Sequence, residues 1–288
     1  MSTMPNQPKL IWFFAVAAFL LSLYSLRGNN ASIPTPSVED LPGLVKSIDI
    51  GGELRVGYGI FPPFTQEDPE TRAVSGICVD IMNEVGRQLG VKVVWKRFNW
   101  NTMMADLKRG EFDVLADAVF QTPARGRELS FTEPYAYFAI GIGVVRKQDN
   151  RFDTFDEIND PKVKVAVGKG FAEETFVRAR VPKAVILPII SSSDTAAPIN
   201  EVITGRADIA IVNLEDAKRF VSANSENLRI LWADKPPAFV PAGFGLRFGD
   251  LTGSEMLNVS LRNLRSTGVL LSIAKRYGAE ANFQPPPL

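Results

Sequence analysis

Two stretches of this chain share one layout, and that repetition limits the possible folds more than any other feature. In each stretch an apolar segment of strand length leads into a helical pattern, which ends at a glycine turn that feeds a second apolar segment. We therefore predict two similar α/β lobes whose strand ends face each other across a ligand-binding cleft. The alternative is that strand–turn–helix units recur in any α/β protein. The copies cover residues 50–117 and 163–213, with apolar segments at 54–57, 114–117, 163–168 and 209–213.

The composition argues against several function classes. Lys and Arg total 32, as do Asp and Glu, so the net charge of zero gives no reason to expect nucleic-acid binding. The 288 residues include no histidine, which removes the commonest general base and the usual zinc and haem ligands. The single cysteine, Cys78, lies between Ile77 and Val79 and is predicted to be a buried, inert thiol. We accordingly expect neither a metal site nor a cofactor.

The amino terminus has the pattern of a targeting segment. Lys9 precedes an apolar run over residues 10–23, so residues 1–27 are predicted to be a secretory signal peptide. Because no Ala-x-Ala cleavage pattern ends the run, an uncleaved membrane anchor over residues 10–26 is the alternative. Residues 28–48 are predicted to be a linker, with prolines at 34, 36 and 42. Either way, we expect the globular part to be exported to the periplasm.

The rest of the chain gives an ordered series of predicted elements. Two apolar, glycine-containing segments, 138–146 and 238–247, are candidate crossings between the lobes. Two crossings imply a discontinuous first lobe, which we assign to residues 49–140 and 243–288, and a second lobe over residues 141–242 with the hinge segments. The other predicted elements are strands at 53–59 and 91–95, a proline loop at 60–64, helices at 76–89 and 101–109, and helices over 254–277 broken near Gly268.

An ordered set of motifs in this chain resembles a known family. The motifs are Phe61-Pro62-Pro63-Phe64, Gly76-Ile77-Cys78-Val79-Asp80, Gly110-x-x-Asp113, Thr122-Pro123-Ala124-Arg125 and Phe131-Thr132-Glu133-Pro134-Tyr135. Together they are similar to the extracellular solute-binding proteins of family 3, the periplasmic components of polar amino-acid ABC importers. The resemblance covers about residues 52–277. It implies the type II periplasmic binding protein fold, α/β with two lobes joined by two crossing hinge strands, and a membrane ABC permease as partner. We expect a monomer.

Arg125 is the leading candidate for ligand binding. It follows a Thr-Pro turn just past a predicted buried strand, which places it at the mouth of the cleft, and its guanidinium offers a planar pair of donors to a carboxylate. The resemblance implies that this arginine binds the α-carboxylate of the ligand. The alternative is a surface arginine paired with Glu128 or Glu133. Arg127 fits the motif less well and is expected at the surface.

Three further residues of the first lobe are candidate cleft residues. Phe61 and Phe64 are predicted to line the cleft and to bury the apolar body of a ligand, although Phe64 could instead be core. Asp117 ends the strand before the arginine loop, where it could cap a turn or pair with a ligand amine.

The second lobe departs from the family pattern. Where the family has a Gly-Thr-Thr/Ser loop, this chain has Gly170 followed by Phe171 and Ala172, so the helix amino terminus keeps its amides but loses the hydroxyl. Asn213 stands where many members have the aspartate that binds the α-ammonium. In the first lobe, Phe120 is a further candidate ligand-binding residue and replaces a polar residue common before the Thr-Pro turn. These changes leave ligand identity open, and an apolar or aromatic carboxylate fits them at least as well as glutamate or arginine.

Three functions follow from these patterns. The first is transport, with a small carboxylate, such as an amino acid or a related compound, captured for an ABC importer. The second is a cyclohexadienyl dehydratase-like enzyme on the same fold, for which Asp117, Glu173 or Asp80 would have to be the general acid. The third is a membrane-anchored sensory module that uses the same cleft. We favour transport and expect no catalytic residues, because no second acid is convincingly placed.

Overall fold

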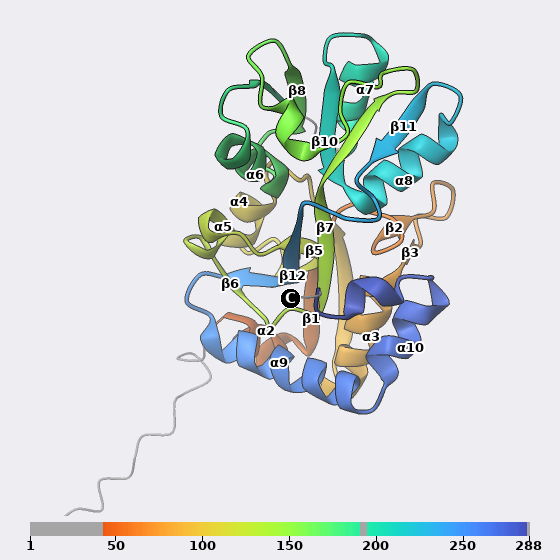
Figure 1. Cartoon of the computed structure of the whole chain (residues 1–288). Helices are drawn as coiled ribbons and strands as arrows, with labels where there is room; N and C mark the ends of the chain where they lie inside the picture. The colour runs from red at the N-terminus through yellow and green to blue at the C-terminus, as the bar shows by residue number, and fades with distance from the viewer. Residues whose placement is uncertain (1–42, 191–194, 287–288) are drawn as a thin grey trace, which may run out of the picture. The chain divides into compact units, whose positions relative to one another are not determined.

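A mixed β-sheet runs through the protein and divides it into two α/β halves joined by two long strands. The computed structural model describes residues 43–190 and 195–286. The strands follow the order β4-β1-β5-β12-β7-β10-β8-β9, with β11 paired to β7 and β6 paired to β12. Strands β7 (Ala136–Arg146) and β12 (Ala238–Arg247) pair antiparallel at the centre of this order. Figure 1 shows them running between the two halves.

The first half is built on three parallel strands. Strand β1 (Glu53–Tyr58) pairs with β4 (Lys92–Arg97) on one side and with β5 (Val114–Phe120) on the other. Every residue of β5 is buried, as expected of a strand covered on both faces. The helices of this half are α2 (Gly43–Gly51), α3 (Ile77–Leu89), α4 (Met103–Lys108), α5 (Pro123–Gly126), α9 (Leu251–Ser266), α10 (Val269–Arg276) and η3 (Glu280–Phe283); its short strands are β2 (Gln66–Glu67), β3 (Val74–Ser75) and β6 (Leu129–Phe131).

The second half repeats this plan. Strand β8 (Lys164–Gly168) pairs parallel with β9 (Val185–Ile189) and with β10 (Ile209–Asn213), while β11 (Leu228–Leu231) pairs antiparallel with β7. Its helices are η2 (Phe155–Ile158), α6 (Ala172–Arg180), α7 (Ala197–Ile203) and α8 (Leu214–Ala223). The repeated strand–helix layout predicted from the sequence is therefore present in both halves. The domain bounds that we assigned remain a prediction, because β7 and β12 cross without interruption.

Two glycines end helices as the sequence pattern indicates. Gly90 follows α3 in the left-handed region at φ 68°, and Gly268 separates α9 from α10 at φ 74°. A side chain would make these conformations costly, so glycine fixes both helix boundaries. The predicted break near Gly268 is confirmed.

The predicted linker over residues 28–48 is wrong in its last part. Helix α2 begins at Gly43, and Leu44 is fully buried in the core of the first half. The amide of Leu44 also donates to Asp250 Oδ2 (2.8 Å) at the start of α9. The prolines end at Pro42, and the apolar residues beyond it have helical spacing, so this segment folds onto the first half. Residues 28–42 lie outside the described residues.

The signal peptide or membrane anchor predicted for residues 1–27 also lies outside the described part of the chain. Within residues 43–190 and 195–286, no helix combines the length and apolar character needed to cross a membrane. Cys78 is fully buried, as predicted, with its sulfur 3.1 Å from the hydroxyl of Tyr135. Burial raises the pKa of this thiol well above its usual value.

We expect Gly141→Ala to destabilise the protein. Gly141 lies in β7 at φ 80°, and a Cβ atom there would be 2.7 Å from Phe176 Cε1 and 3.2 Å from Pro237 Cβ. Strain and crowding together should cost about 1–3 kcal/mol of unfolding free energy. Gly51→Ala is the matched control, since a Cβ atom there would have no other atom within 4 Å and its φ is not positive. Chemical denaturation that gave both variants equal stability would contradict this account of β7.

Candidate functional site

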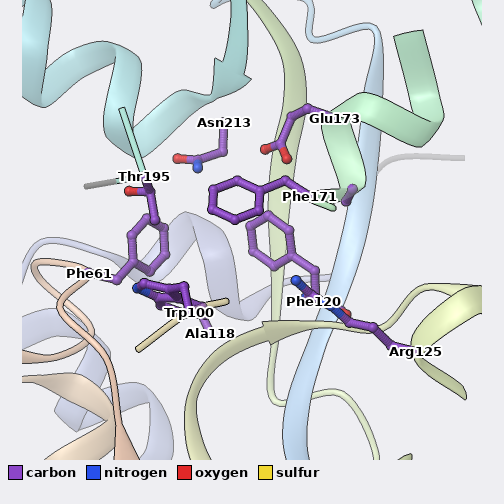
Figure 2. Close-up of a pocket in the computed structure, with 10 residues that line it drawn as sticks. Phe61, Trp100, Ala118, Phe120, Arg125, Phe171, Glu173, Thr195 and Asn213 are labelled. Carbon is purple, nitrogen blue, oxygen red and sulfur yellow. Dashed lines mark hydrogen bonds between the residues drawn. The ribbon is translucent and has the colours of Figure 1, made fainter. Parts of the chain in front are cut away.

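A pocket lies between the two halves and is lined equally by both. The first half contributes Phe61, Trp100, Ala118, Phe120 and Arg125, and the second half contributes Phe171, Ala172, Glu173, Thr195 and Asn213. The pocket holds about 350 Å³ of space not filled by atoms, part of it open to solvent. In Figure 2, Glu173 and Asn213 lie on one side, Trp100 and Arg125 lie on the other, and phenylalanine rings fill the region between them. A molecule in this pocket would contact both halves at once.

The short helix α5 positions Arg125. Thr122 caps this helix, and its hydroxyl oxygen accepts a hydrogen bond from the amide of Arg125 (3.2 Å). Arg125 Nη1 donates to the carbonyl oxygen of Phe120 (3.1 Å), which turns the guanidinium toward the pocket. Burial lowers the pKa of Arg125, and the negative charge of Glu173 partly opposes that shift. Even so, an arginine stays charged in proteins.

The alternative partners proposed for Arg125 are occupied elsewhere. Glu128 forms a salt bridge with Lys108 (2.8 Å), and Glu133 forms one with Arg262 (2.6 Å). Arg127 is exposed, as expected. Arg125 is therefore the arginine of this loop that lines the pocket.

Aromatic rings form the apolar walls, and glycines make room for two of them. A Cβ atom on Gly59 would lie 2.7 Å from the Trp100 ring, and one on Gly168 would lie 2.5 Å from the Phe171 ring. Gly168 ends strand β8, and Gly59 directly follows strand β1. At both positions an aromatic ring packs directly on the backbone, where only a glycine leaves room for it. Phe61 and Phe120 make an edge-to-face contact with ring centroids 6.5 Å apart.

The structure places Phe64 in the core and away from the pocket lining. Its side chain has no exposed surface, and its ring packs on Phe138 (4.7 Å between centroids) and on Phe61 (5.7 Å). Phe64 thus supports Phe61 from behind, and the prediction that it lines the cleft directly is corrected.

Asp117 also points away from the pocket. Successive residues of a strand face opposite sides, so the presence of Ala118 and Phe120 on the pocket directs Asp117 elsewhere. Its carboxylate accepts hydrogen bonds from the amide of Gly59 (3.0 Å) and the hydroxyl of Thr65 (2.5 Å), and from the amide of Ala118 (2.8 Å). Burial raises the pKa of Asp117 to about 7, although these three bonds oppose the shift. The sequence left two roles open for Asp117, capping a turn and pairing with a ligand amine. The structure favours the first, because the carboxylate accepts its hydrogen bonds from groups of the protein.

Asn213 lines the pocket, but its side chain is largely used for capping. Its Oδ1 accepts from the amide of Asp216 (2.9 Å), and its Nδ2 donates to Asp216 Oδ2 (2.9 Å), at the start of α8. The amide group therefore has one N–H left for another acceptor.

Glu173 is the most unusual group in the pocket. It lies in the first turn of α6 and is only 2% exposed. Neither carboxylate oxygen has a partner at full hydrogen-bond geometry, although its own backbone amide and the Asn213 side chain are close enough to lower its pKa. Burial raises the pKa of Glu173 to about 7 and the nearby Asp216 adds to the shift, while its own backbone amide, Arg125 and the Asn213 side chain oppose it. A carboxylate in this state is costly unless a bound molecule or a proton neutralises it.

Sequence reasoning missed several lining residues. Trp100, Ala118 and Thr195 were not predicted, and Glu173 was considered only as a possible acid. A signal for Glu173 did exist, because it and Glu174 are acidic residues in the first turn of the helix that follows Gly170 and Phe171. Within residues 43–190 and 195–286, no group of three or more Cys, Asp or Glu side chains is arranged to hold a metal ion.

Two α/β halves joined by two antiparallel strands, with a pocket between them, define the type II periplasmic binding protein fold. The chain belongs to the bacterial extracellular solute-binding proteins, family 3, whose family model matches residues 54–280.

Individual relatives agree with this assignment. The chain is 26% identical to an L-cystine-binding protein of Bacillus subtilis over 275 residues, covering 94% of this chain and 97% of the relative. It is 27% identical to a cyclohexadienyl dehydratase of Pseudomonas aeruginosa over 168 residues, covering 58% of this chain and 61% of that enzyme. It also superposes, with a TM-score of 0.71 and 25% identity, on an ancestral amino acid-binding protein described as a precursor of cyclohexadienyl dehydratase; the match covers 84% of this chain and 100% of the ancestral one.

Asp117→Asn should lower stability without changing solute affinity. An amide has a single acceptor oxygen, so at least one of the donors around Asp117 would lose its partner, which should cost about 1–3 kcal/mol of unfolding free energy.

The cost of Asp117→Asn should also depend on pH. Because the folded-state pKa of Asp117 is raised to about 7, between about pH 4 and pH 7 the carboxyl ionises in the unfolded chain while it stays protonated in the folded protein, which favours unfolding. The Asn side chain does not ionise, so the stability of the variant does not change in this way with pH. Denaturation should therefore show a larger loss of unfolding free energy, relative to wild type, at pH 5 than at pH 8. A variant of unchanged stability that binds solutes at least tenfold more weakly would return Asp117 to the ligand site.

Proposed function

We propose that this protein captures a small amino acid or a related carboxylate in the periplasm and delivers it to a membrane ABC permease. The single observation that supports this best is the position of Arg125. It is the cationic side chain among the pocket-lining residues, it stands among aromatic rings, and the opposite half of the molecule completes the pocket. A guanidinium binds a carboxylate through two parallel hydrogen bonds, which orients the ligand as well as holding it.

The two crossing strands suit a protein that closes around its ligand. Because the pocket is lined from both halves, a ligand makes its full set of contacts only when the halves are close together. Binding would then shift a hinge equilibrium toward the closed form, with bending in β7 and β12. The closed form of a monomer would be the state that the permease recognises.

The family assignment supports an extracytoplasmic location. Its members are extracellular solute-binding proteins, and the apolar run at residues 10–23 provides an export signal. In this proposal the signal directs the protein to the periplasm, whether it is then cleaved or kept as an anchor.

We expect Arg125→Ala to abolish solute binding while the fold is kept. A thermal-shift screen of L-amino acids and simple carboxylates would first identify solutes that stabilise the wild-type protein. Calorimetric titration with such a solute should then show at least a tenfold loss of affinity, since breaking a buried charge pair costs about 2–5 kcal/mol.

Arg127→Ala is the matched control for this test. Arg127 lies two residues away on the same loop and is exposed, so the control variant should bind the solute as tightly as the wild type does. If both variants kept wild-type affinity, or if no amino acid or carboxylate stabilised the protein, the proposed function would be contradicted.

A second candidate function is acid-catalysed removal of water from a cyclohexadienyl carboxylate. It is favoured by the buried carboxyl of Glu173, whose pKa of about 7 suits a general acid, and by the similarity to a cyclohexadienyl dehydratase. Protonation of a ring hydroxyl lets it leave as water, and loss of the ring carboxylate as carbon dioxide supplies the electron pair that makes the ring aromatic, so ultraviolet absorbance after incubation separates the two functions. Turnover that disappears in Glu173→Gln would establish the enzyme; a bound but unchanged compound would support solute capture.

A further inference from the structure

Unpaired polar atoms are concentrated in this pocket. Across residues 43–190 and 195–286, five buried side-chain nitrogen and oxygen atoms have no hydrogen-bond partner. Three of the five line the pocket, namely Trp100 Nε1 and both carboxylate oxygens of Glu173. Buried polar groups are nearly always paired, so such a cluster indicates that a bound molecule supplies the missing partners.

The two walls of the pocket need opposite partners. Glu173 offers only acceptors when it is ionised, and its position in the first turn of α6 favours the negative charge. Trp100 and Arg125 offer only donors, and Figure 2 shows them on the side opposite Glu173. The complementary ligand therefore carries a donor, best a cation, at one end and an acceptor, best an anion, at the other.

The remaining lining residues limit the rest of the ligand. They are the apolar side chains of Phe61, Ala118, Phe120, Phe171 and Ala172, together with Thr195 and the capping residue Asn213. A third charge on the ligand would meet aromatic rings and would lose its hydration without gaining a partner.

We propose that Glu173 and Trp100 determine specificity in this site, with Glu173 binding the ligand's ammonium group and Trp100 donating to its carboxylate beside Arg125. The ligand class is then an α-amino acid with an uncharged, apolar or aromatic side chain. Glu173 thereby supplies the negative charge that Asn213 lacks. This inference rests on the proposed function and specifies the solute that the same pocket takes.

The test compares amino acids with their deaminated counterparts by calorimetric titration. The probes are L-phenylalanine against 3-phenylpropanoate and L-leucine against 4-methylpentanoate, with L-arginine and L-glutamate as charged competitors. For the wild type, at least one of the two amino acids should bind at least tenfold more tightly than its deaminated counterpart and than either charged amino acid.

Three variants separate the roles of the two residues. Glu173→Gln should weaken binding of the preferred amino acid at least tenfold and leave its deaminated counterpart unaffected. Trp100→Phe should weaken both compounds by a similar factor, because the carboxylate is common to them. Glu215→Gln is the matched control, since Glu215 is a half-buried carboxyl in the first turn of a helix, with a raised pKa and one buried, unpaired oxygen, but lies outside this pocket.

Several results would overturn the inference. Equal binding of amino acid and deaminated counterpart, or an unchanged preference in Glu173→Gln, would show that Glu173 does not act as the ammonium partner. Tighter binding of L-arginine or L-glutamate would overturn the uncharged ligand class. The proposed function would still stand in those cases if Arg125→Ala abolished binding of the preferred solute. Failure of all six probes to bind the wild type would also overturn the ligand class. If Glu173→Gln did not fold, the wild-type comparison of paired probes would decide the question.

Discussion

The antiparallel pairing of β7 with β12 is the constraint on which the rest of the structure depends. Strand β12 pairs on its other side with β5 of the first half, and β7 pairs with β10 of the second half, so these two strands hold the halves in register. That register brings the end of β5, which carries Phe120 and leads to Arg125, opposite the end of β10, which carries Asn213. The pocket exists because two similar α/β units present their strand ends to each other across this pair.

Much of the fold could be predicted from the sequence because its signals are local. Glycine turns and short apolar runs mark the strand–helix units, and the second predicted crossing, residues 238–247, matches β12 residue for residue. Helix α2 was missed for a physical reason: its stability depends on burying Leu44 and on the bond to Asp250, which is 206 residues away in the chain. The helical spacing of its apolar residues spans only nine residues, so it is a weak signal for a helix held by such distant contacts.

The candidate site was harder to predict than the fold. Arg125 could be assigned because a motif and the chemistry of its guanidinium agree. Asp117 and Phe120 were both placed on the cleft, although residues three apart on a strand face opposite sides, and the structure keeps only Phe120 there. Trp100 escaped notice and Glu173 was considered only as a possible acid, because what marks both as binding groups is a buried polar atom without a well-aligned hydrogen bond, a property that only the packed structure reveals.

The central claim is that the unpaired atoms of this pocket are recognition groups for a solute. The most direct measurement is a crystal structure of the protein with the preferred amino acid bound. The account predicts a ligand ammonium within about 3.2 Å of the Glu173 carboxylate, and ligand carboxylate oxygens at similar distances from Trp100 Nε1 and the Arg125 guanidinium. A solute bound elsewhere, or one that leaves Glu173 without a partner, would contradict it.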